Sequence, residues 1–259
     1  MRDMFTITPS HKSRINSNST AQSMSVIRTI LLLAGLLLGG CASTSHNTNP
    51  KDPLEGFNRS MYSFNDTLDK AVLKPVAQGY DAVMPAPAKK MVHNFFSNID
   101  DIFVTANDLL QLKFAQAASD FTRVWVNSTF GIFGLFDVAD KLEKHNEDFG
   151  QTLGYWGVGS GPYLVLPFLG PSSFRDGTGL AVDSHYGVVE NIEDIPVRNS
   201  LWATSKVDQR VHLLPTEKII EDTVVDRYSF IRDGYLMHRQ SLVYDGDPPR
   251  EKYEDDDDE

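Results

Sequence analysis

The stretch that decides the fold is residues 52–72, which read DPLEGFNRSMYSFNDTLDKAV. An acid, a proline and a glutamate at positions 52, 53 and 55 resemble a capping box and predict that a helix begins at Asp52. Large apolar residues then recur at spacings of four, three, four and four, which is one face of a 3.6-residue period. They are Phe57, Met61, Phe64, Leu68 and Val72. Pro75 is expected to stop or bend this helix.

The same helical spacing recurs along most of the remaining chain. After Pro85, a second apolar stripe covers residues 91–99, and further helical patterns cover 101–112 and 114–125. Beyond a central loop, residues 197–213 and 216–242 again show helical spacing. No stretch of the first half alternates convincingly with period two, and no repeat of fixed period is present. The sequence therefore predicts a mainly α fold, with a single helical domain over residues 52–244.

Composition narrows the class of protein further. The chain has 259 residues, of which 41% are hydrophobic and 23% charged, which excludes collagen-like, disordered and polytopic-membrane classes for the bulk of the chain. The net charge of −11 argues against nucleic acid as a partner, because such binding needs clustered Lys and Arg. A single cysteine excludes an internal disulfide and a thiolate zinc site.

Residues 1–40 have the pattern of a secretory signal. Arg28 precedes the apolar run Ile30–Gly40, whose eleven residues are too few for a spanning helix, which needs about 20. The order Leu-Gly-Gly-Cys at positions 38–41 resembles a bacterial lipobox, which implies diacylglycerol and a further acyl chain such as palmitate on Cys41. Met24 would begin a compact signal and is the favoured start over Met1. The alternative is an uncleaved apolar helix followed by a buried, unmodified cysteine.

Two polar segments flank the predicted domain. Residues 41–51 lack apolar periodicity and are predicted to be a lipidated, flexible tether. Residues 245–259 end in six consecutive acidic residues, which predicts a solvated, disordered tail because like charges repel. A docking tail for a basic partner is the alternative for this segment.

The segment 129–136, TFGIFGLF, breaks the amphipathic pattern. It is too apolar and too rich in glycine for a surface helix. One interpretation is a turn buried between two helices, and the other is an apolar hairpin that enters lipid. The second interpretation assigns membrane contact to Phe130, Ile132, Phe133, Leu135 and Phe136.

The second break in the helical pattern is residues 149–176, FGQTLGYWGVGSGPYLVLPFLGPSSFRD. Six glycines and three prolines exclude one continuous helix, yet the segment is too apolar for an ordinary surface loop. We expect it to line a cavity or a slot between helices. Residues 163–166 suit a short strand, but one strand makes no sheet.

Several motifs in this order resemble the MlaA/VacJ family of outer-membrane lipoproteins. They are DPLEGFNR at 52–59, MYSFN at 61–65, FGQTLG at 149–154, GVGSGPY at 157–163, LP at 166–167 and RD at 175–176. The resemblance covers about Asp52 to Arg239. The leader before Met24 and the tail after Tyr244 fall outside it.

The resemblance implies a ring-like helical protein around an amphipathic channel, anchored at the periplasmic face of the outer membrane. It further implies removal of misplaced phospholipids from the outer leaflet, beside a trimeric porin and toward a periplasmic lipid carrier, which maintains lipid asymmetry. A lipid path needs polar and apolar surface side by side. We assign it to residues of the first helix and the glycine-rich loop, namely Phe64, Asn65, Tyr155, Trp156, Tyr163 and Leu166.

Enzyme alternatives find little support in the sequence. Ser160 lacks the flanking glycines of a nucleophile elbow, because Val158 and Pro162 occupy those positions. The histidines show no metalloprotease spacing, and no phosphate-binding loop ending in Lys-Ser or Lys-Thr occurs. We therefore expect no enzyme, no metal and no cofactor beyond the acyl chains on Cys41. The alternative function is that of a structural outer-membrane lipoprotein without transport activity.

Overall fold

The computed structural model describes residues 49–249 of the chain. The predicted signal peptide, Cys41, most of the tether and the acidic end of the tail lie outside the described residues. Lys51, at the end of the predicted tether, already contacts the folded body, since its carbonyl oxygen accepts a hydrogen bond of 3.0 Å from the Tyr163 amide.

The first helix, α2 (Glu55–Leu68), begins three residues later than the capping pattern predicts. Leu54 occupies its N-cap position and provides no side-chain hydrogen bond. The prediction of a cap at Asp52 is wrong because that carboxylate is buried and accepts hydrogen bonds from other elements. Pro75 does not end the helical run either, since a π-helical turn, Asp69–Leu73, leads into α3 (Lys74–Val83). Proline fits there because the first turn of a helix needs no amide donor.

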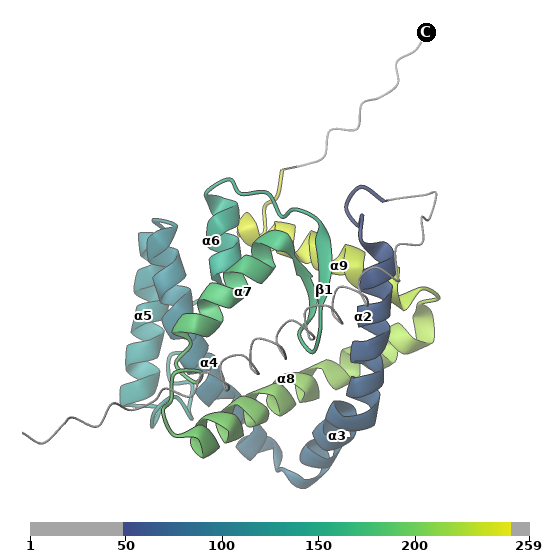
Figure 1. The fold of residues 1–259 in the computed structure, drawn as a ribbon. Helices are drawn as coiled ribbons and strands as arrows, with labels where there is room; N and C mark the ends of the chain where they lie inside the picture. Colours follow the sequence, from purple (N-terminus) through teal and green to yellow (C-terminus); the bar gives the residue numbers. More distant parts are fainter. Residues whose placement is uncertain (1–48, 250–259) are drawn as a thin grey trace, which may run out of the picture. The chain divides into compact units, whose positions relative to one another are not determined.

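Two long helices follow and confirm the predicted apolar stripes. Helix α4 (Ala86–Leu110) contains the stripe at 91–99 and most of the pattern at 101–112 in one continuous helix. Helix α5 (Phe114–Thr129) covers the pattern at 114–125. The two helices pack side by side (Figure 1).

In the last third of the chain, the predicted break between helices is in the wrong place. Helix α8 (Ile195–Thr223) continues through Pro215, and α9 (Arg227–Val243) begins only after residues 224–226. Ion pairs hold α8 together across the proline, because Arg210 bonds both to Glu217 and to Asp69. The break falls where the Asp226 side chain accepts from the Ser229 amide and caps α9.

The glycine-rich segment contains more regular structure than the sequence predicts. It forms α6 (Phe149–Tyr155), an antiparallel hairpin of β1 (Tyr163–Leu166) and β2 (Gly170–Ser173), and the start of α7 (Phe174–Tyr186). The expectation that the strand would lack a partner is therefore wrong. Asp148 and Ser173 cap the two helices, since their side chains accept hydrogen bonds from the amides of Gln151 and Asp176.

Helices α6 and α7 approach each other closely at a pair of glycines. A Cβ atom on Gly179 would lie 2.3 Å from the Gly150 amide nitrogen, which leaves no room for any side chain. These glycines are therefore required for helix contact. Others in the segment, including Gly157 and Gly170, adopt the left-handed backbone angles that the sequence suggests.

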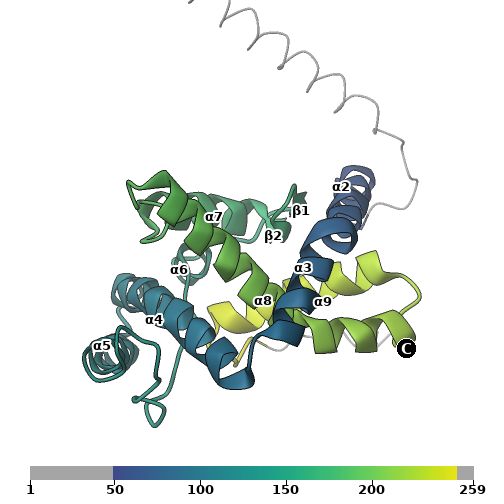
Figure 2. The same ribbon diagram turned by 90° about the horizontal axis from the view of Figure 1, so that it is seen from below.

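Figures 1 and 2 show how these elements are placed within residues 49–249. Helices α4 and α5 lie at one end and α2 and α3 at the other, with α8 running between them. Helix α7 and the β-hairpin lie between α4 and α2 on another side. A small apolar core formed by Tyr163, Val165 and Tyr228 joins β1 to α9, with Met61 and Tyr62 of α2 packed against it.

The interior is unusually polar. Among the described residues, fully buried polar or charged side chains outnumber fully buried apolar ones, while many large apolar side chains are exposed. No described helix is long and apolar enough to cross a bilayer. Buried polar groups and exposed apolar groups are the informative departures from ordinary burial, so this body departs from a typical water-soluble domain on both counts.

A buried polar network around Asp52 and Asn58 joins three parts of the chain. The Asn58 side chain donates to Asp52 at 2.8 Å and to the Tyr163 carbonyl at 3.0 Å, and accepts from the Val165 amide at 2.9 Å. The Asp52 carboxylate also accepts from the Tyr228 hydroxyl and from Arg232. One fully buried amide therefore fixes α2 against the edge of β1.

Replacing Asn58 with Ala should lower the free energy of unfolding by about 2–4 kcal/mol, because three buried polar groups lose a partner. Denaturant unfolding of the purified protein measures this. Ser60→Ala is the matched control, since Ser60 is exposed on the same helix and bonds only to the Gly56 carbonyl, and it should change stability by less than about 0.5 kcal/mol. Equal effects of the two substitutions would contradict the role of Asn58.

The interface of α4 and α5 contains a carboxyl group that accepts no hydrogen bond from the described residues and lies beside the carboxyl group of Asp120. Asp108 is fully buried, and neither of its carboxylate oxygens accepts a hydrogen bond from the described residues. Burial, together with the nearby charges of Asp120 and Glu147, raises the pKa of Asp108 to about 7. The proton therefore binds more tightly in the folded than in the unfolded state, and this group favours folding at low pH.

The contribution of Asp108 should be lost as the pH rises from about 4 to about 7, since the folded state then has to hold a buried charge. Asp108→Asn should flatten that part of the stability profile and raise the free energy of unfolding at pH 8 by about 1–3 kcal/mol. Thermal unfolding at pH 5 and pH 8 tests this, with exposed Asp140→Asn as the control. A profile that Asp108→Asn leaves unchanged would show that this carboxyl does not titrate as described.

Candidate functional site

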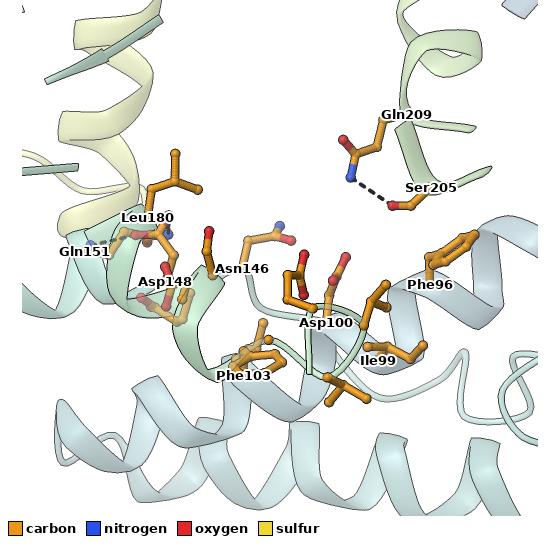
Figure 3. A pocket seen from close by; sticks show the side chains of 18 of the residues that line it. Phe96, Ile99, Asp100, Phe103, Asn146, Asp148, Gln151, Leu180, Ser205 and Gln209 are labelled. Atoms are coloured by element: carbon orange, nitrogen blue, oxygen red, sulfur yellow. Dashed lines mark hydrogen bonds between the residues drawn. The ribbon is translucent and has the colours of Figure 1, made fainter. Parts of the chain in front are cut away.

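A cavity of about 630 Å³ lies between α4, α6, α7, α8 and α9 (Figure 3). Apolar side chains from α4 and α8 meet polar side chains from the segment before α6 and from α7. The residues that define its character include Phe96, Asp100, Phe103, Asp148, Gln151, Leu180, Asp183, Trp202, Lys206, Gln209, His238 and Arg239. The lining is therefore mixed, with carboxylates, amides and aromatic rings facing one space.

Two carboxyl groups that line the cavity, one on α4 and one on α7, hold their protons more tightly than usual. Asp100 on α4 is open to the cavity, whose walls limit the water around it, and this desolvation raises its pKa to about 6 despite nearby Lys144. Burial likewise raises the pKa of Asp183 on α7 to about 6, although Asp183 accepts a hydrogen bond from the Phe149 amide. The cavity therefore disfavours additional negative charge near these two groups.

Arg239 of α9 lines the cavity and joins three elements. Its guanidinium donates at 2.9 Å to Asp148 before α6 and at 2.9 Å to Asp176 of α7. Burial alone would raise the pKa of Asp176, but the hydrogen bonds and charge of Arg239 outweigh it and hold that pKa at about 2. Arg239 also lines a second cavity of about 320 Å³ on the side of residues 157–161, so it separates the two spaces.

Lys206 is the cation of the main cavity that is not committed to an ion pair. Among the described residues, its ammonium group lies within 4.0 Å of no carboxylate, whereas its nearest polar contact is the Gln209 amide oxygen at 3.2 Å. The ammonium also lies 6.0 Å from the centre of the Trp202 ring. A cation beside an aromatic ring suits a ligand with both an anionic and an apolar part.

The six residues assigned to a lipid path from the sequence are divided between the surface and the core, and none of them lines the main cavity. Phe64 and the half-buried Asn65 lie on α2, where the Phe64 ring packs on Phe168. The Asn65 side chain donates to the Leu166 carbonyl and accepts from the Phe168 amide, which fixes the turn between β1 and β2. Leu166 is half-buried beside them.

The three aromatic residues of that assignment differ in exposure. Tyr155 and Trp156 are half exposed, and the Trp156 indole donates to the Leu110 carbonyl at 3.1 Å. Tyr163 is fully buried among Tyr228 and Tyr235, so lipid reaches it only if this core opens. The assignment of all six residues stays a prediction. The glycine backbone at 157–161, in contrast, does line the second cavity.

The segment 129–136 forms a tight turn that exposes its apolar side chains. The exposed fraction is 65% for Phe130, 57% for Ile132 and 77% for Phe133, and Phe136 is also exposed while Leu135 is half-buried. The interpretation of a turn buried in the core is therefore wrong for most of these side chains. Exposed aromatic residues at 114, 121 and 125 lie on one face of α5, and Trp125 packs edge to face on Phe130.

The backbone of this turn holds its side chains outward. Ile132 and Phe133 have φ angles of 54° and 57°, in the left-handed region that β-branched and bulky residues avoid. Such angles cost about 1–3 kcal/mol each and occur where the surrounding structure imposes them. Gly134 is required at the next position, since a Cβ there would lie 2.6 Å from Asn98.

A buried polar cluster at the base of the turn imposes this geometry. Asn127 donates to Asp137 at 2.9 Å and accepts from the amides of Val138 and Ala139 at 2.8 and 3.0 Å. Arg123 donates to the Ala139 and Leu142 carbonyls at 2.8 and 2.9 Å. The turn is therefore fixed to α5 by two buried side chains, and its apolar tip cannot fold back into the core.

These features define a class of mainly helical protein with a polar interior, an exposed apolar face and a cavity of mixed lining. The model of the family described as MlaA lipoprotein matches residues 50–242. The chain belongs to this family.

The chain is also similar to individual bacterial proteins. The chain is 34% identical over 226 residues to the intermembrane phospholipid transport system lipoprotein MlaA of Escherichia coli K12, covering 84% of this chain and 88% of that protein. The MlaA of Haemophilus influenzae Rd is 32% identical over 230 residues, covering 85% and 92%. An uncharacterized protein of Rickettsia felis is 36% identical over 200 residues, covering 74% and 78%.

A solved structure has a similar fold. It comes from work on the structural basis for maintenance of bacterial outer membrane lipid asymmetry, and it matches with a TM-score of 0.66 and 32% identity. The match covers 74% of this chain and 98% of the other. The mainly α fold predicted from the sequence is thus confirmed both by the structure and by its neighbour.

Sequence reasoning missed the residues of the main cavity. They are spread over five elements and include ordinary polar residues such as Asp100, Asp183 and Lys206, which carry no motif. The sequence did contain one local signal for this region, namely two residue types that cap helices. The side chains of Asp148 and Ser173 each accept a hydrogen bond from the amide three residues later and so begin α6 and α7. Recognising those caps would have placed α6 and α7, and hence two walls of the cavity.

Replacing Asn127 with Ala should destabilise the protein by about 2–3 kcal/mol, because the amides of Val138 and Ala139 lose their acceptor and the half-buried Asp137 loses one of its donors. It should also release the turn, so that limited proteolysis cleaves within 130–136 before other sites. Thr122→Ala on the same helix is the control, since Thr122 is exposed and bonds only to the Ala118 carbonyl. Cleavage rates that match in the two variants would contradict the role of Asn127 in holding the turn.

Proposed function

We propose that the chain takes misplaced phospholipids from the outer leaflet of the outer membrane and passes them toward a periplasmic carrier. Its family membership supports this role, and two relatives carry the name intermembrane phospholipid transport system lipoprotein. The observation that carries the proposal is the exposed apolar turn 130–136, whose backbone presents aromatic side chains outward beside an apolar face of α5. Such a surface suits contact with acyl chains.

The main cavity is the proposed place for the lipid head group. Lys206 would attract the phosphate, and the Gln209, Gln151 and Asn146 amides offer hydrogen bonds that replace water. Phe96, Phe103 and Trp202 supply adjoining apolar surface for the acyl chains. The ring-like channel implied by the family and the six residues Phe64, Asn65, Tyr155, Trp156, Tyr163 and Leu166 belong to this proposal as the remainder of the path.

The proposed transport is passive and includes no catalytic step. A phospholipid is out of place among the lipopolysaccharide of the outer leaflet, so its inward movement is favourable. The barrier to crossing limits only the rate of this movement. The protein lowers that barrier by keeping the head group solvated while the acyl chains stay in apolar surroundings. Net flow toward the inner membrane then depends on the partners, which we propose to be a trimeric porin and a periplasmic lipid carrier.

We further propose that the chain lies at the periplasmic face of the outer membrane, held by acyl chains on Cys41. Several chains make such attachment stable, since each buried methylene contributes about 0.8 kcal/mol. The turn 130–136 would add a second contact with the membrane. The alternative function, a structural lipoprotein, shares this location and differs only in lacking lipid transport.

The function is tested in cells from which the gene has been deleted, by measuring phospholipid exposed in the outer leaflet. Deletion should raise that amount, and the full chain should restore it. Phe133→Asp should restore it about 30- to 150-fold less well, because a carboxylate in the apolar layer costs about 2–3 kcal/mol. Val225→Asp is the matched control, since Val225 is fully exposed in the connection between α8 and α9, and should restore it fully.

The outcomes separate the alternatives. If deletion leaves outer-leaflet phospholipid unchanged, the structural lipoprotein is the better description. If deletion raises it but Phe133→Asp restores it as well as Val225→Asp, transport stands and the assignment of the turn fails. Circular dichroism of both variants excludes a trivial loss of folding.

A further inference from the structure

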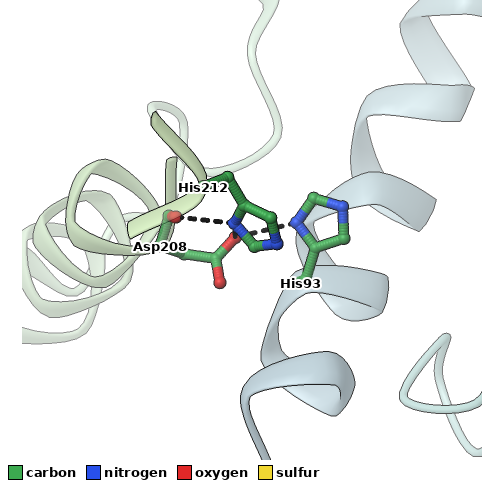
Figure 4. Close-up of side chains that lie close together, drawn as sticks. All are labelled: His93, Asp208 and His212. Atoms are coloured by element: carbon green, nitrogen blue, oxygen red, sulfur yellow. Dashed lines mark hydrogen bonds and ion pairs between the residues drawn. The ribbon is translucent and has the colours of Figure 1, made fainter. Parts of the chain in front are cut away.

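Two histidines and a buried aspartate meet between α4 and α8 (Figure 4). His93 comes from α4, and Asp208 and His212 come from α8, where they are four residues apart and therefore on one face. Each of the three residues offers one potential ligand atom, and these atoms all lie within 4.8 Å of one another. None of the three lines the main cavity.

The second ring nitrogen of His212 is available for a ligand. Its Nδ1 lies 2.9 Å from the Asp208 carbonyl oxygen, so Nδ1 carries the proton and donates it to that carbonyl. Nε2 is then unprotonated, and Figure 4 shows this nitrogen on the side of the ring that faces His93. Histidines that bind metals typically donate their other ring N–H to a carbonyl or carboxylate, so the supporting hydrogen bond is already in place.

Asp208 supplies a negative charge that is only partly satisfied. Its side chain is 3% exposed, and Oδ2 lies 3.0 Å from Nδ1 of His93. The other oxygen, Oδ1, has no hydrogen-bond partner among the described residues, and the same holds for the buried hydroxyl of Tyr80. Burial and the negative charge of Asp208 raise the pKa of that tyrosine. A buried carboxylate with a free oxygen is costly unless a cation compensates it.

The two imidazoles leave the cluster accessible from solvent. Their side chains are 48% and 49% exposed, and the ring centres are 4.1 Å apart. An ion can therefore enter without disturbing the interior, and water can fill a remaining position. Because both rings are at the surface, small rotations are enough to adjust their spacing.

We propose that His93, Asp208 and His212 bind a divalent transition-metal ion, with Zn²⁺ as the preferred ion. Two imidazole nitrogens, one carboxylate oxygen and a water molecule form the tetrahedral set that zinc commonly takes. Bonds of about 2.0–2.2 Å place such ligands roughly 3.3–3.5 Å apart, so the contact between His93 and Asp208 opens by a few tenths of an ångström. The proton that His93 shares with Asp208 is released to solvent when the ion binds.

The ion would clamp two helices that also form walls of the main cavity. Phe96 follows His93 by one turn on α4, and Ser205 and Gln209 are neighbours of Asp208 on α8. A bond between the helices at this position fixes their spacing at one edge of the cavity. The inference stands apart from the proposed transport, because metal binding is measured without lipid.

Metal binding is tested with the full chain, free of any affinity tag and treated with chelator, in detergent solution. Cobalt(II) is the first probe, and it should produce visible absorption bands of tetrahedral nitrogen and oxygen coordination that Zn²⁺ abolishes. Zn²⁺ should also raise the midpoint of thermal unfolding, whereas Mg²⁺ at the same concentration should not.

His93→Gln and His212→Gln should each weaken Zn²⁺ binding by about 10–100-fold and remove the thermal shift. His185→Gln is the matched control, because His185 is an exposed histidine on α7 outside the cluster, and it should bind like the parent protein. Absence of cobalt bands in the parent protein would overturn the proposal whatever the variants do. So would Zn²⁺ affinities that are equal in the parent protein and in both cluster variants.

Discussion

A buried charge is costly unless a partner compensates it, and within residues 49–249 ion pairs and hydrogen bonds between distant segments organise the interior. Asp52 joins the segment before α2 to α2 and α9, Arg123 joins α5 to the segment after its turn, and Arg239 joins α9 to α6 and α7. The partners are far apart in sequence, so each cluster fixes a tertiary contact. Because removing one partner leaves an uncompensated buried charge, these clusters determine the positions of the helices more strictly than apolar packing does.

A polar interior leaves the apolar side chains to the outside. In water such an arrangement forfeits much of the hydrophobic stabilisation of a domain, but against acyl chains the exposed face of α5 and its turn becomes favourable surface. The small apolar core around Tyr163 and Tyr228 is then sufficient because it only has to hold the β-hairpin against α2 and α9. The polar clusters and the apolar exterior together suit the proposed position of the protein against a membrane.

The elements that could be predicted from the sequence are the long helices, because their apolar pattern repeats over many turns. Helices α4 and α5 followed from stripes that extend over many turns, whereas α6 and the β-hairpin are too short to show a period at all. The break predicted between residues 213 and 216 is absent, and local spacing could not show that an ion pair of Arg210 with Glu217 spans this part of α8. Of the candidate sites, the apolar turn could be recognised from the sequence, because apolar residues and glycines are concentrated in residues 129–136. The cavity was not, since only folding brings together Asp100, Asp183 and Lys206.

The left-handed residues Ile132 and Phe133 have a consequence for how the turn meets a surface. A flexible apolar loop loses conformational freedom when it inserts, and that loss weakens binding. This turn has little conformational freedom to lose, because Asn127 and Arg123 already fix its backbone to α5 in the protein alone. The turn and α5 therefore move as one rigid unit, and if the turn enters a bilayer as proposed, tilting the body would require withdrawing aromatic rings from the lipid.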